Sequence, residues 1–166
     1  ATHRLAERGG GSEGDGAAAI ETMIRSAMRL SEAGEQGFAG PLFGTAVPAL
    51  ERIAPVSVTA RYRTAWAQSF YEEGKLAEAA ATLTPLSDAV LPSRPALIQL
   101  RAILLLAEER FSEATTMLTP IAGLTDEASG QEAAVAQSLR SWALFRGGEA
   151  EAGVADARQA CDLLVP

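Results

Sequence analysis

Paired acidic residues are the groups in this chain best suited to acid–base chemistry. Glu72 with Glu73, and Glu108 with Glu109, place two carboxylates next to each other, so that one could act as an acid and the other as a base. Each pair closes a helix-patterned stretch just before a turn, where solvated charges are ordinary. We therefore interpret both pairs as surface charges and predict no catalytic residue among them.

Nucleophilic and metal-binding chemistry lack the partners that they need. His3, the only histidine, lies in a glycine-rich N-terminal stretch that offers no second metal ligand. No strand pattern precedes those glycines and no Gly-Lys-Ser/Thr sequence follows them, so we expect no phosphate-binding loop there. Cys161, the only cysteine, lies in an apolar helix pattern typical of a buried or half-buried, inert thiol. The sequence therefore predicts no enzyme, no cofactor and no metal site.

The charge and hydropathy of the chain narrow the kinds of partner that it can have. The 166 residues carry a net charge of −7, which disfavours nucleic acids and anionic membranes because both are negatively charged. No apolar run approaches the roughly 18 residues of a membrane span. A single cysteine fits a reducing compartment, so we expect a cytoplasmic protein. One lysine and no asparagine, beside abundant alanine, arginine and glycine, indicate a bacterial gene rich in G and C.

Residues 65–83 contain two amphipathic helices joined by a tight turn. Apolar residues recur at the three-and-four spacing of one helix face on both sides of Gly74. A glycine ends a helix there because it adopts the left-handed conformation without steric cost. Two helices joined by so few residues pack antiparallel, as a helical hairpin. The apolar positions are Trp66, Ala67, Phe70 and Tyr71 before the glycine, and Leu76, Ala79, Ala80 and Leu83 after it.

The same hairpin recurs twice along the chain. The segment 71–79 aligns with 106–114 and with 144–152, at spacings of 114 − 79 = 35 and 152 − 114 = 38 residues. A Leu-Thr-Pro sequence also recurs, at 83–85 and 118–120. An internal period of about 34 residues built from helical hairpins is typical of a repeat architecture.

On these motifs the chain resembles the tetratricopeptide repeat (TPR) family. The first copy matches best, with Ala67 as the small residue where the helices touch and Gly74 at the turn. The second copy has Glu109 in place of the turn glycine. The third has Gly147 at the turn and Arg140 at the small position, as expected of an atypical terminal repeat. The resemblance implies an all-α fold in which antiparallel helical hairpins stack as a right-handed solenoid.

The repeats also set the expected domain organisation. Residues 1–16 are rich in glycine, and we predict a flexible tail there. Residues 17–166 are expected to form one TPR-like domain. Its parts are a degenerate hairpin at 17–55, repeats at 58–90 and 95–122, and a terminal repeat at 131–164.

The resemblance also implies where a partner would bind. In TPR proteins the first helices of the hairpins line a concave groove that holds an extended or helical peptide. The variant that clamps C-terminal carboxylates uses lysine and asparagine in that groove, and this chain has no asparagine. The same apolar residues could equally be core that neighbouring repeats cover. The predicted partner-binding residues are Arg61, Gln68, Tyr71, Gln99, Ile103, Leu106, Gln137, Leu144 and Phe145.

The sequence therefore predicts a non-enzymatic protein–protein interaction module, an adaptor or chaperone that binds an apolar segment of a partner protein. The layout is similar to that of small TPR secretion chaperones. The alternative is a sensor or oligomerisation segment of a larger bacterial transcriptional or signalling protein. We also expect a homodimer, through Leu163-Leu164 or the amphipathic helix at 17–33, because a short stack leaves such apolar surfaces uncovered.

Overall fold

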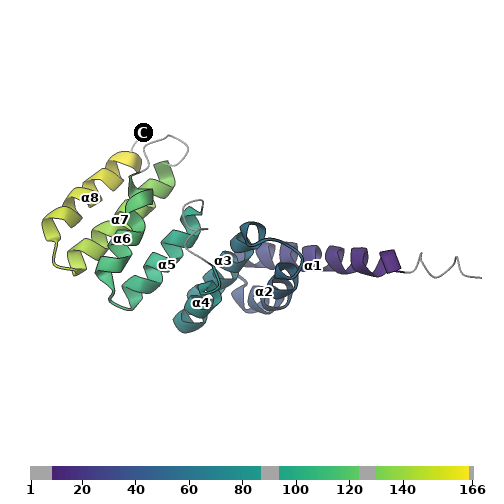
Figure 1. The fold of residues 1–166 in the computed structure, drawn as a ribbon. Helices are drawn as coiled ribbons and strands as arrows, with labels where there is room; N and C mark the ends of the chain where they lie inside the picture. The colour runs from purple at the N-terminus through teal and green to yellow at the C-terminus, as the bar shows by residue number, and fades with distance from the viewer. Residues whose placement is uncertain (1–8, 87–93, 124–129, 165–166) are drawn as a thin grey trace, which may run out of the picture. The chain divides into compact units, whose positions relative to one another are not determined.

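A computed structural model of the chain describes residues 9–86, 94–123 and 130–164, and all regular secondary structure in these ranges is α-helical (Figure 1). This confirms the expected all-α class. The predicted flexible tail lies outside the described residues at positions 1–8. The helices are α1 (Gly9–Glu32), α2 (Gln36–Glu51), α3 (Val56–Glu72), α4 (Leu76–Leu83), α5 (Pro95–Ala107), α6 (Phe111–Ala122), α7 (Gly130–Arg146) and α8 (Ala150–Leu164).

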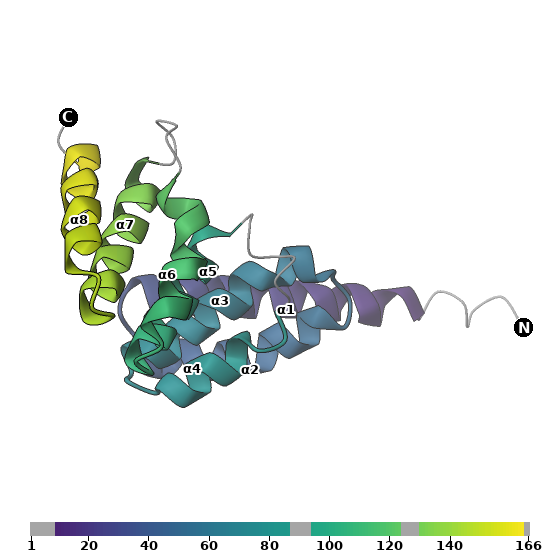
Figure 2. The ribbon, with the colours of Figure 1, turned by 60° about the vertical axis from the view of Figure 1, so that its left-hand side comes forward.

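The helices divide between two compact units, residues 1–86 with α1–α4 and residues 87–166 with α5–α8. Both units have the same pattern of contacts. In each, every helix packs on the next one in the chain, and the first helix also touches the third. Figure 2 shows this succession of neighbours, for instance α7 beside α8. Each unit is thus a pair of helical hairpins, α1–α2 with α3–α4, and α5–α6 with α7–α8.

All four hairpins turn in the same way. A residue with positive φ follows each first helix: Gly34 at 80°, Gly74 at 74°, Glu109 at 60° and Gly148 at 93°. The amide of the next residue donates to the carbonyl five positions back, as from Lys75 to Phe70 at 2.8 Å. The same bond measures 2.8 Å, 2.9 Å and 2.8 Å in the other three turns. This Schellman closure satisfies a carbonyl that the helix end would leave unpaired.

Small residues lie at fixed offsets from each turn. Seven residues before it and five after it, the first and second helices carry alanine, serine or glycine, where two backbones must approach closely. All are buried except Ser141, which is half-buried. The pairs are Ala27 and Ala39, Ala67 and Ala79, Ala102 and Ala114, and Ser141 and Gly153.

This common geometry changes the alignment of the last hairpin by one residue. The turn lies at Gly148 and not at Gly147, so the hairpin lies 148 − 109 = 39 residues after its predecessor. The small position is consequently Ser141, and the expectation that Arg140 occupies it is wrong. The side chain of Arg140 instead bonds Asp156 of α8, at 2.5 Å and 2.8 Å.

Two segments differ from the expected boundaries. The first helix begins at Gly9 rather than at Ala17, so residues 9–16 are helical and not part of a flexible tail. The rest of α1 nucleates this segment, although each of its glycines costs about 1 kcal/mol relative to alanine in a helix. Pro120 lacks the amide that a helix needs and is expected to end or kink its helix, yet α6 continues through it to Ala122.

Each unit has its own core. In residues 1–86, Phe43 and Val47 of α2 pack with Ala27 of α1, and Trp66 of α3 lies against them. In residues 87–166, the buried cluster joins α5, α6 and α7 and consists of Ile98, Ala102, Leu106, Ala114, Leu118, Ile121, Ala122, Ala136 and Ala143. In each unit the first helices therefore contribute buried residues to the core, α1 and α3 in residues 1–86 and α5 and α7 in residues 87–166.

Candidate functional site

The predicted partner-binding residues come from three first helices in the two units. Arg61, Gln68 and Tyr71 lie on α3, which belongs to residues 1–86. The other six lie on α5 and α7, which belong to residues 87–166. The candidate surface is therefore built separately in each unit.

Three of the nine predicted residues are buried within their own unit. Leu106 is 4% exposed and belongs to the core of α5, α6 and α7. Leu144 is also buried, and the buried amide of Gln137 donates to the carbonyl of Ala122 at 2.8 Å. Ile103 and Gln99 stay half-buried, and Phe145 is 60% exposed. The predicted apolar floor thus reduces to Ile103 and Phe145 in this unit.

Two residues of α7 were missing from the prediction because of the one-residue shift. With the turn at Gly148, the positions equivalent to Gln99 and Ile103 are Ser138 and Trp142. Both are exposed, Trp142 to 46%. A check of the flanking small residues would have chosen between the two consecutive glycines, since only Gly148 places Ser141 and Gly153 at the offsets found in the other hairpins.

We use the term first-helix face for three positions on each first helix, which lie ten, six and three residues before the turn. At the middle position three side chains are half-buried and that of Trp142 is exposed, and three of the four residues are apolar. The face consists of Ile24, Met28 and Ser31 on α1, Thr64, Gln68 and Tyr71 on α3, Gln99, Ile103 and Leu106 on α5, and Ser138, Trp142 and Phe145 on α7.

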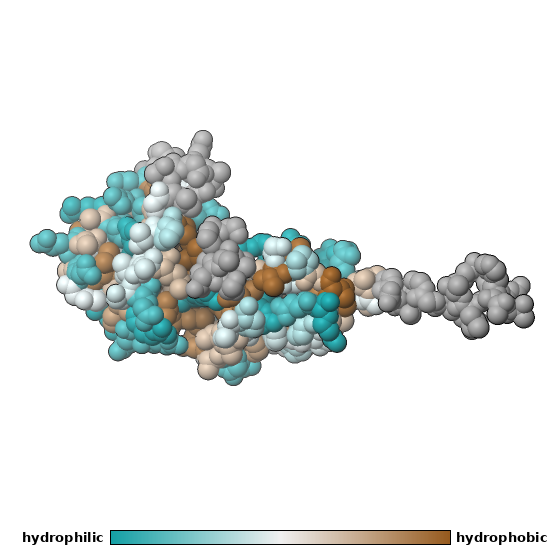
Figure 3. Space-filling view, in the orientation of Figure 1, coloured by the Kyte–Doolittle hydropathy of each residue, from teal (hydrophilic) through white to brown (hydrophobic). Residues whose placement is uncertain are grey.

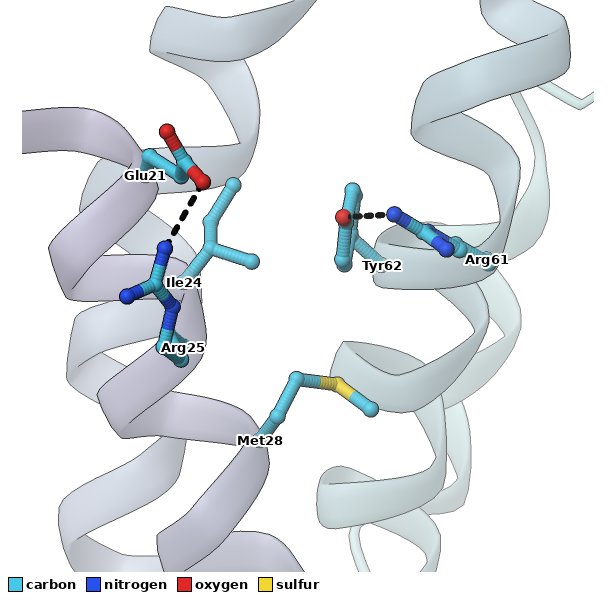
Figure 4. A pocket seen from close by; sticks show the side chains of 6 residues that line it. All are labelled: Glu21, Ile24, Arg25, Met28, Arg61 and Tyr62. Carbon is cyan, nitrogen blue, oxygen red and sulfur yellow. Dashed lines mark hydrogen bonds and ion pairs between the residues drawn. The ribbon is translucent and has the colours of Figure 1, made fainter. Parts of the chain in front are cut away.

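In residues 1–86 this face borders a cleft of about 350 Å³ between α1 and α3. Figure 4 shows Ile24 and Met28 directed from α1 toward the space that Tyr62 enters from α3. Ile24 is buried, whereas Met28 and Tyr62 are half-buried, so the cleft has an apolar floor. Methionine adapts its unbranched side chain to irregular apolar ligands, which suits a binding cleft.

Charged groups surround that floor. Arg25 and Glu21 form an exposed ion pair on α1, 2.7 Å between Nη2 and Oε1. Across the cleft, the guanidinium of Arg61 lies 4.4 Å from the ring centre of Tyr62 and donates to its hydroxyl (Figure 4). An apolar floor with a charged rim resembles a protein-binding cleft more than a reaction centre.

The face of α7 is aromatic. Trp142 and Phe145 border a second cleft, of about 190 Å³, between α7 and α8. The guanidinium of Arg146 lies 5.6 Å from the ring centre of Trp142 and 5.3 Å from that of Phe111 on α6. Exposed aromatic residues beside an arginine are the composition found at protein-binding hot spots.

The shifted pKa values belong to ion pairs outside the two clefts. A hydrogen bond from Arg110 lowers the pKa of Glu113, and the hydrogen bonds to Glu113 and Glu108 raise the pKa of Arg110. A hydrogen bond to Glu73 raises the pKa of Lys75. These groups lie at the turns of their hairpins, so their pKa shifts arise from local ion pairs.

The acidic pairs considered for acid–base chemistry are exposed and partnered. Glu72 accepts from Gln68 at 2.9 Å, and Glu73 lies 2.6 Å from Lys75. Glu108 pairs with Arg110 at 2.8 Å. Cys161 is a free, exposed thiol on α8, contrary to the expectation of a buried or half-buried one. Within the described ranges no three His, Cys, Asp or Glu side chains are grouped as metal ligands, and His3 lies outside them.

In Figure 3, hydrophobic residues lie among hydrophilic ones on the visible surface. No helix in the described part of the chain is long and apolar enough to cross a membrane. No protein-family model matches the chain, and the searches of curated proteins and of solved structures gave no match either.

Proposed function

We propose that this chain is a TPR-type protein–protein interaction module that binds an apolar segment of a partner protein on its first-helix face. It would act as an adaptor or chaperone in the bacterial cytoplasm, with its hairpins stacked as a right-handed solenoid. The observation that carries the proposal is the common construction of the four hairpins. Their turns and small residues coincide, while Met28, Ile103 and Trp142 stay partly exposed at one equivalent position.

The contrast between the helix-contact positions and the middle position of the first-helix face supports binding. Positions at which two helices touch carry small, mostly buried residues, which is a requirement of packing. The middle position of the first-helix face needs no apolar residue for packing, yet it carries methionine, isoleucine and tryptophan. Burial of such side chains by a partner would contribute about 25 cal/mol for each Å² of apolar surface covered.

A library of displayed peptides provides a test that needs no known partner. We expect the selected peptides to carry aliphatic or aromatic side chains. Met28→Glu should weaken their binding at least about tenfold, because it places a charge on the apolar floor of the α1–α3 cleft. Binding should persist in about 1 M salt, since apolar contacts are little screened. The matched control is Val58→Glu on α3, an exposed position outside the cleft.

Two outcomes would contradict the proposal. One is that the selected peptides bind Met28→Glu and Trp142→Glu as tightly as the parent chain. The other is that affinity falls steeply with salt, which would indicate ion pairs in place of apolar contacts. Thermal melts of each variant ensure that the loss of binding does not reflect unfolding.

A second candidate is an oligomerisation segment of a larger bacterial signalling protein. The exposed aromatic residues of the last hairpin favour it, because Phe145 occupies the position at which the preceding hairpin has the buried Leu106. A surface of this kind can join two chains as well as bind a peptide.

A further inference from the structure

Two stripes of exposed residues run along α7 and α8 on the same side of the last hairpin. On α8 they are Val154, Ala157, Cys161 and Leu164, at spacings of three, four and three residues. The stripe on α7 consists of Trp142 and Phe145. Both helices contribute to the cleft of about 190 Å³, so the two stripes adjoin. We call the surface formed by these six residues the α7–α8 face.

The preceding hairpin shows what covers the equivalent surface. The equivalent residues of the preceding hairpin lie 39 positions earlier. They are Leu106 for Phe145, Leu118 for Ala157 and Ala122 for Cys161. All three are buried in the core cluster that α5 and α6 form with Ala136 and Ala143 of α7. In the α5–α6 hairpin this surface is therefore covered by another helical hairpin. In the α7–α8 hairpin the equivalent residues are exposed.

The α7–α8 face differs from its predecessor at the position of Ala157. The position of Ala157 holds Leu118, Leu83 and Phe43 in the other three hairpins, all of them fully buried or nearly so. Alanine there, with Ser141 and Gly153 beside it, leaves a recess, and Phe145, Trp142 and Val154 border that recess. The surface thus carries both projecting side chains and a hollow.

A surface with both features can pair with itself. A two-fold contact brings the same patch of two subunits together, so the patch must supply its own complement. We propose that the α7–α8 face binds the α7–α8 face of a second copy of this chain, with the aromatic side chains of one copy entering the recess beside Ala157 of the other. This proposal rests on the second candidate function: the contact covers Trp142 and Phe145 of the first-helix face and leaves the α1–α3 cleft for a peptide.

Cys161 supplies a reporter for this contact. It is the only cysteine of the chain, it is exposed, and its equivalent Ala122 is covered by α7. Sedimentation equilibrium of the full chain should show a dimer. The rate at which iodoacetamide alkylates the folded protein should fall as protein concentration rises, in proportion to the fraction of dimer, because the second copy shields the thiol.

Substitutions on the face separate it from other surfaces. Phe145→Glu and Leu164→Glu replace exposed side chains, so we expect them to fold and to give monomers with fast, concentration-independent alkylation. Val58→Glu, in the other unit, should leave both readouts unchanged. A chain that is monomeric at millimolar concentration would overturn the proposal. So would a dimer in which Cys161 reacts as fast as in the monomer, since the contact would then lie elsewhere.

Discussion

The helices α7 and α8 touch where Gly153 faces Ser141. The hydroxyl of Ser141 donates to the carbonyl of Gly153 at 2.7 Å. A Cβ atom on Gly153 would lie only 2.8 Å from the carbonyl oxygen of Ser141 and 3.2 Å from the amide nitrogen of Phe145. Both are backbone atoms, which cannot rotate away as a side chain can. The approach of these helices therefore requires glycine.

Gly153→Ala should consequently destabilise the fold. The added methyl group must separate α7 from α8 or bend one of them, and overpacking of this kind costs roughly 1–3 kcal/mol. The control is Gly130→Ala at the start of α7, where a Cβ atom meets nothing within 4 Å. Chemical denaturation measures both variants. If Gly153→Ala unfolds at the same denaturant concentration as the parent chain, the helices are not in contact there.

The turn at Glu109 offers the opposite test, because a substitution should stabilise the chain. Glu109 has a φ of 60°, which L-residues other than glycine adopt at a cost of roughly 1–2 kcal/mol. Glu109→Gly relieves that strain but adds freedom to the unfolded chain, so we expect a net gain of at most about 1 kcal/mol. The ion pair with Arg146, 3.9 Å and exposed, contributes little that could be lost.

Glu108→Gly provides the matched comparison for that turn. Glu108 has a φ of −85°, so glycine relieves no strain there and should destabilise the hairpin. Thermal melts of the two variants should therefore shift in opposite directions. A lower melting temperature for Glu109→Gly would show that the left-handed conformation is not strained.

Helix periodicity was sufficient to predict the helical class and the clear hairpins. The turn at Gly74 also followed from sequence, because glycine at the end of an apolar pattern readily adopts positive φ. At Gly34 only the end of the first helix was predicted correctly, since α2 begins at Gln36 and not at the expected Leu42 or Thr45. The turn at Glu109 could be placed only by alignment, since nothing in a glutamate residue favours positive φ. At Gly147-Gly148 the residue type alone fits either position, and only the flanking Ser141 and Gly153 place the turn at Gly148.

The candidate site was harder to predict because periodicity identifies an apolar face without showing what covers it. Leu106 and Phe145 occupy equivalent positions on α5 and α7, and both are large and apolar. One is buried because α6 and α7 pack around it, whereas the other faces solvent. The charged rim of the α1–α3 cleft was likewise not predicted, except for Arg61, because α1 lay outside the clear repeats.

A substitution at Ala102 tests the close contact between α5 and α6. It is fully buried beside Ala114 in the core of residues 87–166. Ala102→Leu should lower the free energy of unfolding by roughly 1–3 kcal/mol, because a close contact has no room for added methylene groups. Ala107→Leu, on the exposed end of α5, is the control and should change little. A melting temperature at or above that of the parent chain would place Ala102 outside any close contact.

The ion pair between Arg140 and Asp156 provides a test of the polar contact between α7 and α8. Both side chains are largely buried, and the two hydrogen bonds join α7 to α8 and raise the pKa of Arg140. Asp156→Asn leaves the guanidinium without a counter-charge, which should cost about 1–3 kcal/mol, the range for an unsatisfied buried polar group. Glu151→Gln, an exposed carboxylate on α8, removes the same charge and should have an effect below about 0.5 kcal/mol. Urea denaturation of the two variants isolates the contribution of the pair, and equal effects would mean that the pair does not hold α7 and α8 together.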